Sequence, residues 1–186
     1  MILTLLENNI AKIAKMHAKL LAKREDKEEL FELYYLGKKL KIVVDIDANR
    51  SFESARVEDN SCFVELIAPL NIETKERIRE HIYKNYAPTL FLDRVEKFAH
   101  QMQLFPSRVS FRKAKTRWGS CSSKNSISLN IALTALPRYL SDYIIIHELA
   151  HIKEKNHSKA FWALVAKYYP NYKEAREELK KFATIL

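Results

Sequence analysis

Hydrophobic residues recur at intervals of mostly three to four near the start of the chain and predict an amphipathic helix over residues 2–22. These positions are Leu6, Ile10, Ile13, Ala14, Leu20 and Leu21. The pattern then becomes extended: residues 31–36 and 40–46 predict a β-hairpin around Gly37, and residues 62–67 predict a further strand. We interpret residues 1–70 as an N-terminal lobe made of a helix and a hairpin.

Helical spacing returns in the second part of the chain. Residues 72–86 and 87–103 predict one long helix or two, with a kink or a new first turn at Pro88. Two shorter helices are predicted near the C-terminus, over 158–169 and 172–182.

Between these helices, alternating residues predict strands over 109–114 and 126–130, and the segment Trp118–Cys121 is predicted as a loop. Short strands mixed with helices indicate an α+β fold. We therefore expect residues 71–186 to form a second domain, the core of the protein.

A further helix is predicted to begin near Leu140 or Ser141, with Asp142 in its first turn. Its apolar residues are Ile144, Ile145, Ile146, Leu149 and Ile152. Taken alone, they predict only that this helix is buried.

The same helix carries the strongest chemical signal, the motif His-Glu-x-x-His at His147, Glu148 and His151. Two histidines four residues apart lie on one face of a helix, where both imidazoles can bind one zinc ion. Glu148, beside the first histidine, can take a proton from a water molecule that such an ion activates. Burying these groups without a partner would be costly, and a metal ion removes that cost.

His157 is the predicted third ligand, six residues after His151. The chain must turn to bring it back, and Asn156 tolerates the left-handed backbone conformation that such a turn would use. The alternative is an acidic ligand from the last helix: Glu174, Glu177 or Glu178. The histidine needs the shorter closing loop.

Composition narrows the class of protein. The chain has 186 residues, 47% of them hydrophobic, without the uninterrupted apolar stretch or leader that a membrane or secreted protein would show, so we expect a cytoplasmic protein with no membrane partner. Its two cysteines, Cys62 and Cys121, are expected to be buried or half-buried thiols. Only Gly37 and Gly119 are glycines, which excludes glycine-rich nucleotide-binding loops.

The formal charge of +9 is dispersed along the chain, with acidic residues in between. We interpret it as a solvated surface, while a nucleic-acid partner or an anionic small substrate are the alternatives.

Several separate motifs together resemble the YgjP-like metallopeptidase family, which is related to the WLM and SprT-like zincins. They are Arg117–Ser122, Leu129–Asn130, Asp142–His151, Asn156–Ser158 and Phe161–Trp162, and the resemblance extends over about 70–182. Members of that family usually begin with additional strands before the first helix, whereas this chain starts almost directly with that helix. A natural short form, a trimmed sequence and an altered start are the alternatives that would explain the difference.

The resemblance implies a zincin-like core with a small antiparallel sheet, an active-site helix and C-terminal helices. It also implies that His147, His151 and His157 hold zinc and that Glu148 is the general base. In such a core the strand after the Arg117 loop would form the sheet edge beside the cleft and pair with an extended peptide. Arg117 itself is a candidate for stabilising an oxyanion or binding an anionic group, although the loop can equally be structural.

We therefore expect a zinc-dependent hydrolase, foremost a metallopeptidase acting on a peptide or another small hydrolysable substrate. A nucleotide phosphoanhydride hydrolase is one alternative, favoured by the basic residues Arg112, Lys113, Lys115 and Arg117. A nucleic-acid-associated module with a residual metal site is another.

Overall fold

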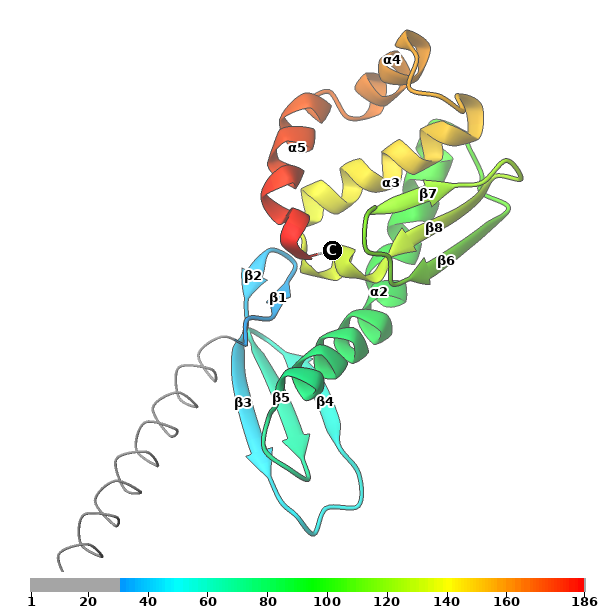
Figure 1. Ribbon diagram of the computed structural model, residues 1–186. Helices are drawn as coiled ribbons and strands as arrows, with labels where there is room; N and C mark the ends of the chain where they lie inside the picture. Colours follow the sequence, from blue (N-terminus) through cyan, green and yellow to red (C-terminus); the bar gives the residue numbers. More distant parts are fainter. Residues whose placement is uncertain (1–30, 186) are drawn as a thin grey trace, which may run out of the picture. The chain divides into compact units, whose positions relative to one another are not determined.

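The computed structural model describes residues 31–185 (Figure 1), so the helix predicted over 2–22 lies outside the described residues. Backbone contacts group residues 33–186 into one compact unit. The domain boundary that we place near residue 70 stays a prediction. No helix in the described part of the chain is both long and apolar enough to cross a membrane.

The first strands, β1 (Tyr34–Tyr35) and β2 (Lys38–Lys39), form a tight antiparallel hairpin. Its turn residues Leu36 and Gly37 have φ angles of 50° and 82°, the positive values of a type I′ turn. Gly37 also has no room for a side chain, because a Cβ there would lie 2.7 Å from Cγ of Pro137. The hairpin thereby packs against the residue that precedes the motif helix.

The N-terminal sheet contains β3 (Lys41–Ile46), β4 (Ser54–Glu58) and β5 (Ser61–Leu66) in the order β3-β5-β4. β3 runs parallel to β5, and β4 pairs with β5 as an antiparallel hairpin. The predicted hairpin between residues 31–36 and 40–46 is therefore correct only for the short β1–β2 turn, because β3 pairs with β5 instead. Strand β4 was not predicted. Alternation specifies an extended segment but not its partner.

Helix α2 (Ile72–Met102) is continuous through Pro88, so the prediction of one long helix is confirmed and the alternative of a new helix that begins at Pro88 is wrong. The side chain of Asn71 caps its first turn by accepting a hydrogen bond from the Thr74 N–H at 2.8 Å. Proline inside a helix costs about 3 kcal/mol, but buried residues on both sides of it, among them Ala87 and Phe91, keep the helix packed against its neighbours.

The second sheet contains β6 (Arg108–Arg112), β7 (Gly119–Cys121) and β8 (Ser126–Asn130) in the order β6-β8-β7. β6 is parallel to β8 and β7 is antiparallel to it, the same topology as in the first sheet. Each three-stranded sheet therefore has one parallel and one antiparallel pairing. The expectation of an antiparallel sheet is wrong. Most of the segment Trp118–Cys121, predicted as a loop, is the edge strand β7. Strand β8, predicted from the resemblance to be the sheet edge, is central.

The remaining elements are helical: η1 (Ile131–Ala135), α3 (Arg138–Lys153), α4 (Lys159–Tyr168), α5 (Tyr172–Leu179) and η2 (Lys180–Ile185). They confirm the predicted C-terminal helices, and with the sheets they confirm the α+β class. Figure 1 shows α3 with the second sheet on one side and α5 on the other.

Helix α3 begins earlier than predicted, with Pro137 at its N-cap. Ser141 donates a hydrogen bond to the carbonyl of Leu133 at 3.3 Å. Asp142 forms a two-pronged ion pair with Arg94 of α2. These two polar side chains therefore fasten α3 to the elements around it, rather than capping its start.

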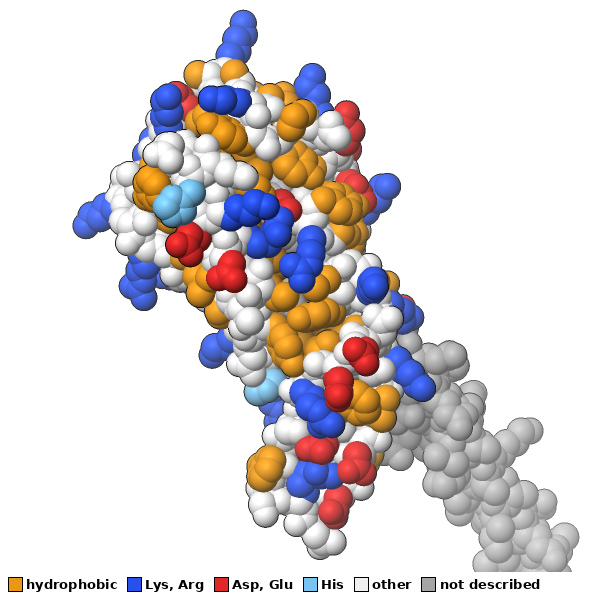
Figure 2. All heavy atoms as spheres, turned by 180° about the vertical axis from the view of Figure 1, so that it is seen from behind, with side chains coloured by type: hydrophobic (Ala, Val, Ile, Leu, Met, Phe, Trp, Pro, Cys, Tyr) orange, Lys and Arg blue, Asp and Glu red, His pale blue; other side chains and the backbone are white. Residues whose placement is uncertain are grey.

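The predicted burial of α3 is confirmed, because Ile145, Ile146 and Leu149 have no exposed surface. Cys62 is likewise buried and Cys121 half-buried, as expected. On the face shown in Figure 2, lysine and arginine side chains are spread widely, with acidic side chains among them. A nucleic-acid partner and a cytoplasmic location stay predictions.

Candidate metal centre

The structure brings the three predicted histidines to one point. His147 and His151 lie one turn apart on α3 with their ring centroids 4.9 Å apart, and the ring of His157 lies 5.0 Å and 4.8 Å from theirs. One nitrogen from each ring can be chosen so that all three lie within 4.8 Å of one another. These imidazoles are a donor set that suits zinc.

The nitrogen positions fit a shared ion. Nε2 of His147 and Nε2 of His157 are 3.1 Å apart. Two nitrogens bound to one zinc ion at about 2.0–2.1 Å in tetrahedral geometry would be about 3.4 Å apart. The two ring nitrogens therefore face each other at close to the spacing of ligands to one ion.

The outer ring nitrogens have partners that orient the rings. Nδ1 of His151 lies 3.0 Å from the carbonyl oxygen of Glu154, so this nitrogen donates its proton and leaves Nε2 free to bind a metal. Nδ1 of His147 lies 3.4 Å from the hydroxyl of Tyr143, one turn earlier on α3. Tyr143 was not predicted, although its spacing of four residues from His147 is a usable signal.

The loop that returns His157 is built differently from the prediction. The described residues with a positive φ angle do not include Asn156, so Asn156 does not form the predicted left-handed turn. Instead Glu154 is extended at the end of α3, and Lys155 donates a hydrogen bond at 2.6 Å to the side chain of Asn125. The loop is thereby tied to the turn between β7 and β8.

The alternative acidic ligands are not part of this cluster. Glu177 is paired with Lys180 at 2.6 Å, and Glu178 accepts a hydrogen bond from Tyr139. Among the described residues, the group that can hold a metal contains the three histidines and no acid from α5. The geometry therefore supports His157.

Aromatic packing and burial favour the neutral form of the histidine rings. The buried ring of Phe161 stacks on His151 at 4.5 Å and meets His147 edge-on at 4.9 Å. Burial, together with the charges of His151 and His157, lowers the pKa of His147 to about 3. A neutral imidazole is the form that binds a metal ion.

Glu148 is buried at the same place, with 6% of its surface exposed. Burial raises the pKa of its carboxyl to about 8, against the opposing charge of Arg117. Its Oε2 has no hydrogen-bond partner among the described residues. The carboxylate lies directly against the β7 backbone, because a Cβ on Gly119 would be 2.7 Å from its Oε1. Such an unpaired buried oxygen is suited to exchanging a proton with a bound water or substrate.

The loop before β7 is held by Asn130, at the end of β8. Its side-chain amide donates to the carbonyls of Ala114 and Arg117 at 2.7 and 2.9 Å, and its oxygen accepts from the N–H of Ala132 at 3.1 Å. The Arg117 side chain is exposed and makes no ion pair with Glu148 in the described part of the chain, yet its charge lowers the pKa of that carboxyl. The loop therefore has a structural role and also brings a cation near the site.

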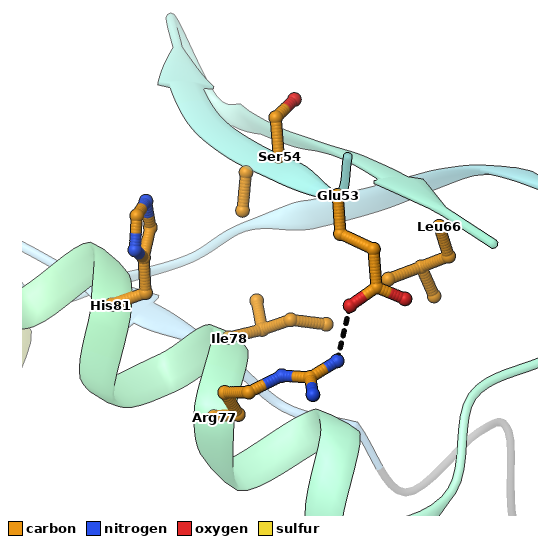
Figure 3. A pocket seen from close by; sticks show the side chains of 7 residues that line it. Glu53, Ser54, Leu66, Arg77, Ile78 and His81 are labelled. Atoms are coloured by element: carbon orange, nitrogen blue, oxygen red, sulfur yellow. Dashed lines mark hydrogen bonds and ion pairs between the residues drawn. The ribbon is translucent and has the colours of Figure 1, made fainter. Parts of the chain in front are cut away.

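A cavity of about 300 Å³ lies between β4, β5 and the first turns of α2, and its described lining residues contain no such donor set. Its lining includes the ion pair between Glu53 and Arg77, and His81 lies one turn further along α2 (Figure 3). Leu66 and Ile78 contribute apolar side chains to the same lining. The chemistry is therefore concentrated at α3.

A helix with two histidines and a neighbouring glutamate, completed by a third histidine, is the arrangement of metal-dependent hydrolases. This chain belongs to the YgjP-like family, since the model of that family's metallopeptidase domain matches residues 2–182. The protein is therefore a hydrolase, of a metal-dependent peptidase family. This match begins at residue 2, whereas the motifs of the resemblance extend only over about 70–182.

Individual proteins match this chain over only part of its length. The UTP pyrophosphatase of Escherichia coli K12 is 30% identical over 73 residues, 39% of this chain and 44% of that protein, so the match spans less than half of the relative. Two solved structures are also similar. The metallopeptidase zymogen of Pyrococcus abyssi abylysin is 29% identical with a TM-score of 0.45, over 48% of this chain and 90% of that one. The zymogen of Methanocaldococcus jannaschii jannalysin is 26% identical with a TM-score of 0.43, over 50% and 95%.

Proposed function

We propose that the protein is a zinc-dependent peptidase in which His147, His151 and His157 hold the ion and Glu148 is the general base. The observation that carries this proposal is the convergence of three histidine nitrogens within 4.8 Å, beside a buried carboxylate. Family membership supports a peptidase.

The protein's own groups account for the proton transfers. A bound zinc ion would supply a Lewis acid that lowers the pKa of a water molecule and polarises a carbonyl. Glu148 takes a proton from the attacking water and passes it to the leaving amine. Burial raises the pKa of this carboxyl, which helps it to hold the proton between the two transfers. Arg117, exposed beside this carboxyl, is our candidate for binding the substrate's developing negative charge.

A peptide substrate has a place to bind. Among the described strands, β7 lies at the edge of its sheet and pairs with β8 alone. Its first residue, Gly119, contacts the carboxylate of Glu148. An extended peptide that added to this edge would lie along the strand and pass the general base.

A nucleotide phosphoanhydride hydrolase is the second candidate, supported by the likeness to the E. coli UTP pyrophosphatase. Magnesium, the usual metal for phosphate chemistry, prefers oxygen ligands, whereas this cluster offers three imidazoles. One of the basic residues that favoured this candidate, Lys113, is already paired with Glu80 at 2.8 Å.

One experiment separates the two candidates. Zinc-loaded protein and its Glu148→Gln variant are incubated with unfolded polypeptides and with a panel of nucleoside triphosphates. We expect peptide cleavage that the variant loses, and no release of phosphate or pyrophosphate. Glu96→Gln, which changes an exposed carboxylate on α2, is the matched control and should keep full activity. Pyrophosphate release that Glu148→Gln abolishes, without peptide cleavage, would establish the second candidate instead.

A further inference from the structure

A stack of aromatic rings leads away from the candidate metal centre towards α5. The ring of Trp162 stacks on His157 at 5.5 Å with an interplanar angle of 20° and on Tyr172 at 5.2 Å with an angle of 17°. It also lies 5.8 Å from the ring of His147. The side chain of Trp162 is half-buried.

Arg176 extends this stack with a positive charge. It follows Tyr172 by one helical turn, and its guanidinium carbon lies 4.6 Å from the centre of the Trp162 ring. The side chain is exposed, and in the part of the chain that the structure describes it makes no ion pair. An aromatic face holds a guanidinium flat and leaves its N–H groups available to an incoming acceptor.

The surroundings of Arg176 form a hollow of about 300 Å³, lined by Trp162, Tyr172, Lys173, Arg176 and Glu177. Glu177 contributes the only negative charge among these lining residues, and Lys180 pairs with it at 2.6 Å. Lys173 and Arg176 therefore leave the hollow with an excess of positive charge. Lys173, Arg176 and Glu177 in its lining are exposed, while the ring of Trp162 in the same lining stacks on His157 of the histidine cluster.

We infer that this hollow is a subsite for a carboxylate group of the substrate, with Arg176 as the residue that selects it. The inference rests on the proposed peptidase function. A planar guanidinium fixed on an indole ring matches the two oxygens of a carboxylate. In a peptide that carboxylate is either an Asp or Glu side chain near the cleaved bond or the free C-terminus.

The test uses the zinc-loaded full-length protein and pairs of quenched fluorescent peptides. Within a pair only the charge changes: Asp against Asn, Glu against Gln, or a free against an amidated C-terminus. We expect kcat/KM to be higher for the carboxylate member, and the pair that shows this identifies the source. Arg176→Gln should lower kcat/KM for that member about 10- to 100-fold, the range of a charge-assisted hydrogen bond, and leave its neutral partner unchanged. Arg176→Glu should in addition raise cleavage of a peptide with Lys at the same position.

Arg56→Gln is the matched control, because Arg56 also lies over a ring, that of Phe63 at 5.0 Å, but in the N-terminal sheet. It should leave the preference unchanged. Equal kcat/KM for both members of every pair in the wild-type protein would overturn the inference. So would an Arg176→Gln variant that loses activity equally on both members, since that describes a merely structural residue.

A binding measurement separates this inference from the proposed function. Titration of zinc-loaded Glu148→Gln protein with the same peptides, followed by tryptophan fluorescence, needs no cleavage. We expect the carboxylate member to bind about 10-fold or more tightly than its neutral partner, and Arg176→Gln in the same background to remove the difference. Tighter binding of a nucleoside triphosphate than of any peptide, dependent on Arg176, would contradict a peptide carboxylate as the ligand. Absence of cleavage by the wild-type protein, with selective binding retained, would count against the peptidase function alone.

Discussion

The side chain of Glu148 fills the space beside Gly119 where another residue would have its side chain: a Cβ on Gly119 would lie 2.7 Å from both Cγ and Oε1 of the glutamate. The backbone of the edge strand β7 and the carboxylate on α3 are therefore in direct contact. Because Glu148 is buried, it cannot swing away without moving towards the metal cluster or the protein interior. The glycine is thus needed for the position of the proposed general base.

Gly119→Ala should displace the carboxylate and lower kcat about 100-fold, the effect expected of a displacement of about 1 Å at a reacting group. Zinc affinity should be unchanged, since the histidines do not contact this position. Peptide cleavage and zinc titration measure the two effects, with Ser120→Ala on the same strand as the control. Full activity in Gly119→Ala would show that the position of Glu148 is not critical.

His157→Ala should weaken zinc binding by more than about 100-fold, because loss of a group that only orients a metal ligand already costs about 10- to 100-fold. Competition with a chelating dye measures the affinity. His100→Ala, which removes an exposed histidine from α2, should leave it unchanged. Unchanged affinity in His157→Ala would reject this ligand, and Glu174, Glu177 and Glu178 would then be the positions to mutate.

Zinc removal should lower thermal stability as well as activity. An ion that binds only the folded protein stabilises it by about 2.7 kcal/mol when present at 100 times its dissociation constant. Calorimetric scans with zinc and with a chelator should therefore give different melting temperatures, and His151→Ala should remove the difference. A zinc-independent melting temperature in the wild-type protein would contradict a metal centre at α3.

Asn130→Ala should destabilise the protein by about 1–3 kcal/mol, because it removes hydrogen bonds to three backbone groups of the Arg117 loop and η1. Urea unfolding measures the change. Asn85→Ala, at an exposed position of α2, is the control. We also expect lower peptidase activity at full zinc occupancy, since the loop precedes β7. Unaltered stability would show that the loop keeps its position without these bonds.

Asp142→Asn should cost about 1–3 kcal/mol of unfolding free energy, because it removes a charged partner from the half-buried Arg94. Zinc stoichiometry should stay the same, as neither residue touches the cluster. The carboxylate of Glu96, 73% exposed on the same helix as Arg94, provides the comparison: Glu96→Gln should change stability little. Equal unfolding curves for the two variants would mean that the Arg94 pair contributes no more than a surface contact.

The sequence predicted what depends on local spacing. A spacing of four residues places His147 and His151 on one face of a helix, whatever that helix packs against. The same reasoning confirmed the C-terminal helices and the α+β class. It placed the start of α3 too late, because Ser141 and Asp142 are residue types that cap helices but here bond to Leu133 and Arg94.

Strand pairing was not accessible in this way. Alternation makes β3 and β8 recognisable as strands, but it does not say that β3 runs parallel to β5 or that β8 is central. Three residues, Gly119 to Cys121, are too few to show a period, so the edge strand that touches Glu148 looked like a loop.

The sequence by itself therefore determined the chemistry that α3 can carry: two histidines and a glutamate at helical spacing, with a third histidine within reach. Only the tertiary structure decided what surrounds that chemistry. It placed Gly119 against Glu148, the Trp162 ring on His157, and Arg176 over Trp162. The physical reason is that these contacts join separate elements, and packing between elements depends on the whole fold, whereas helical spacing depends on a few consecutive residues.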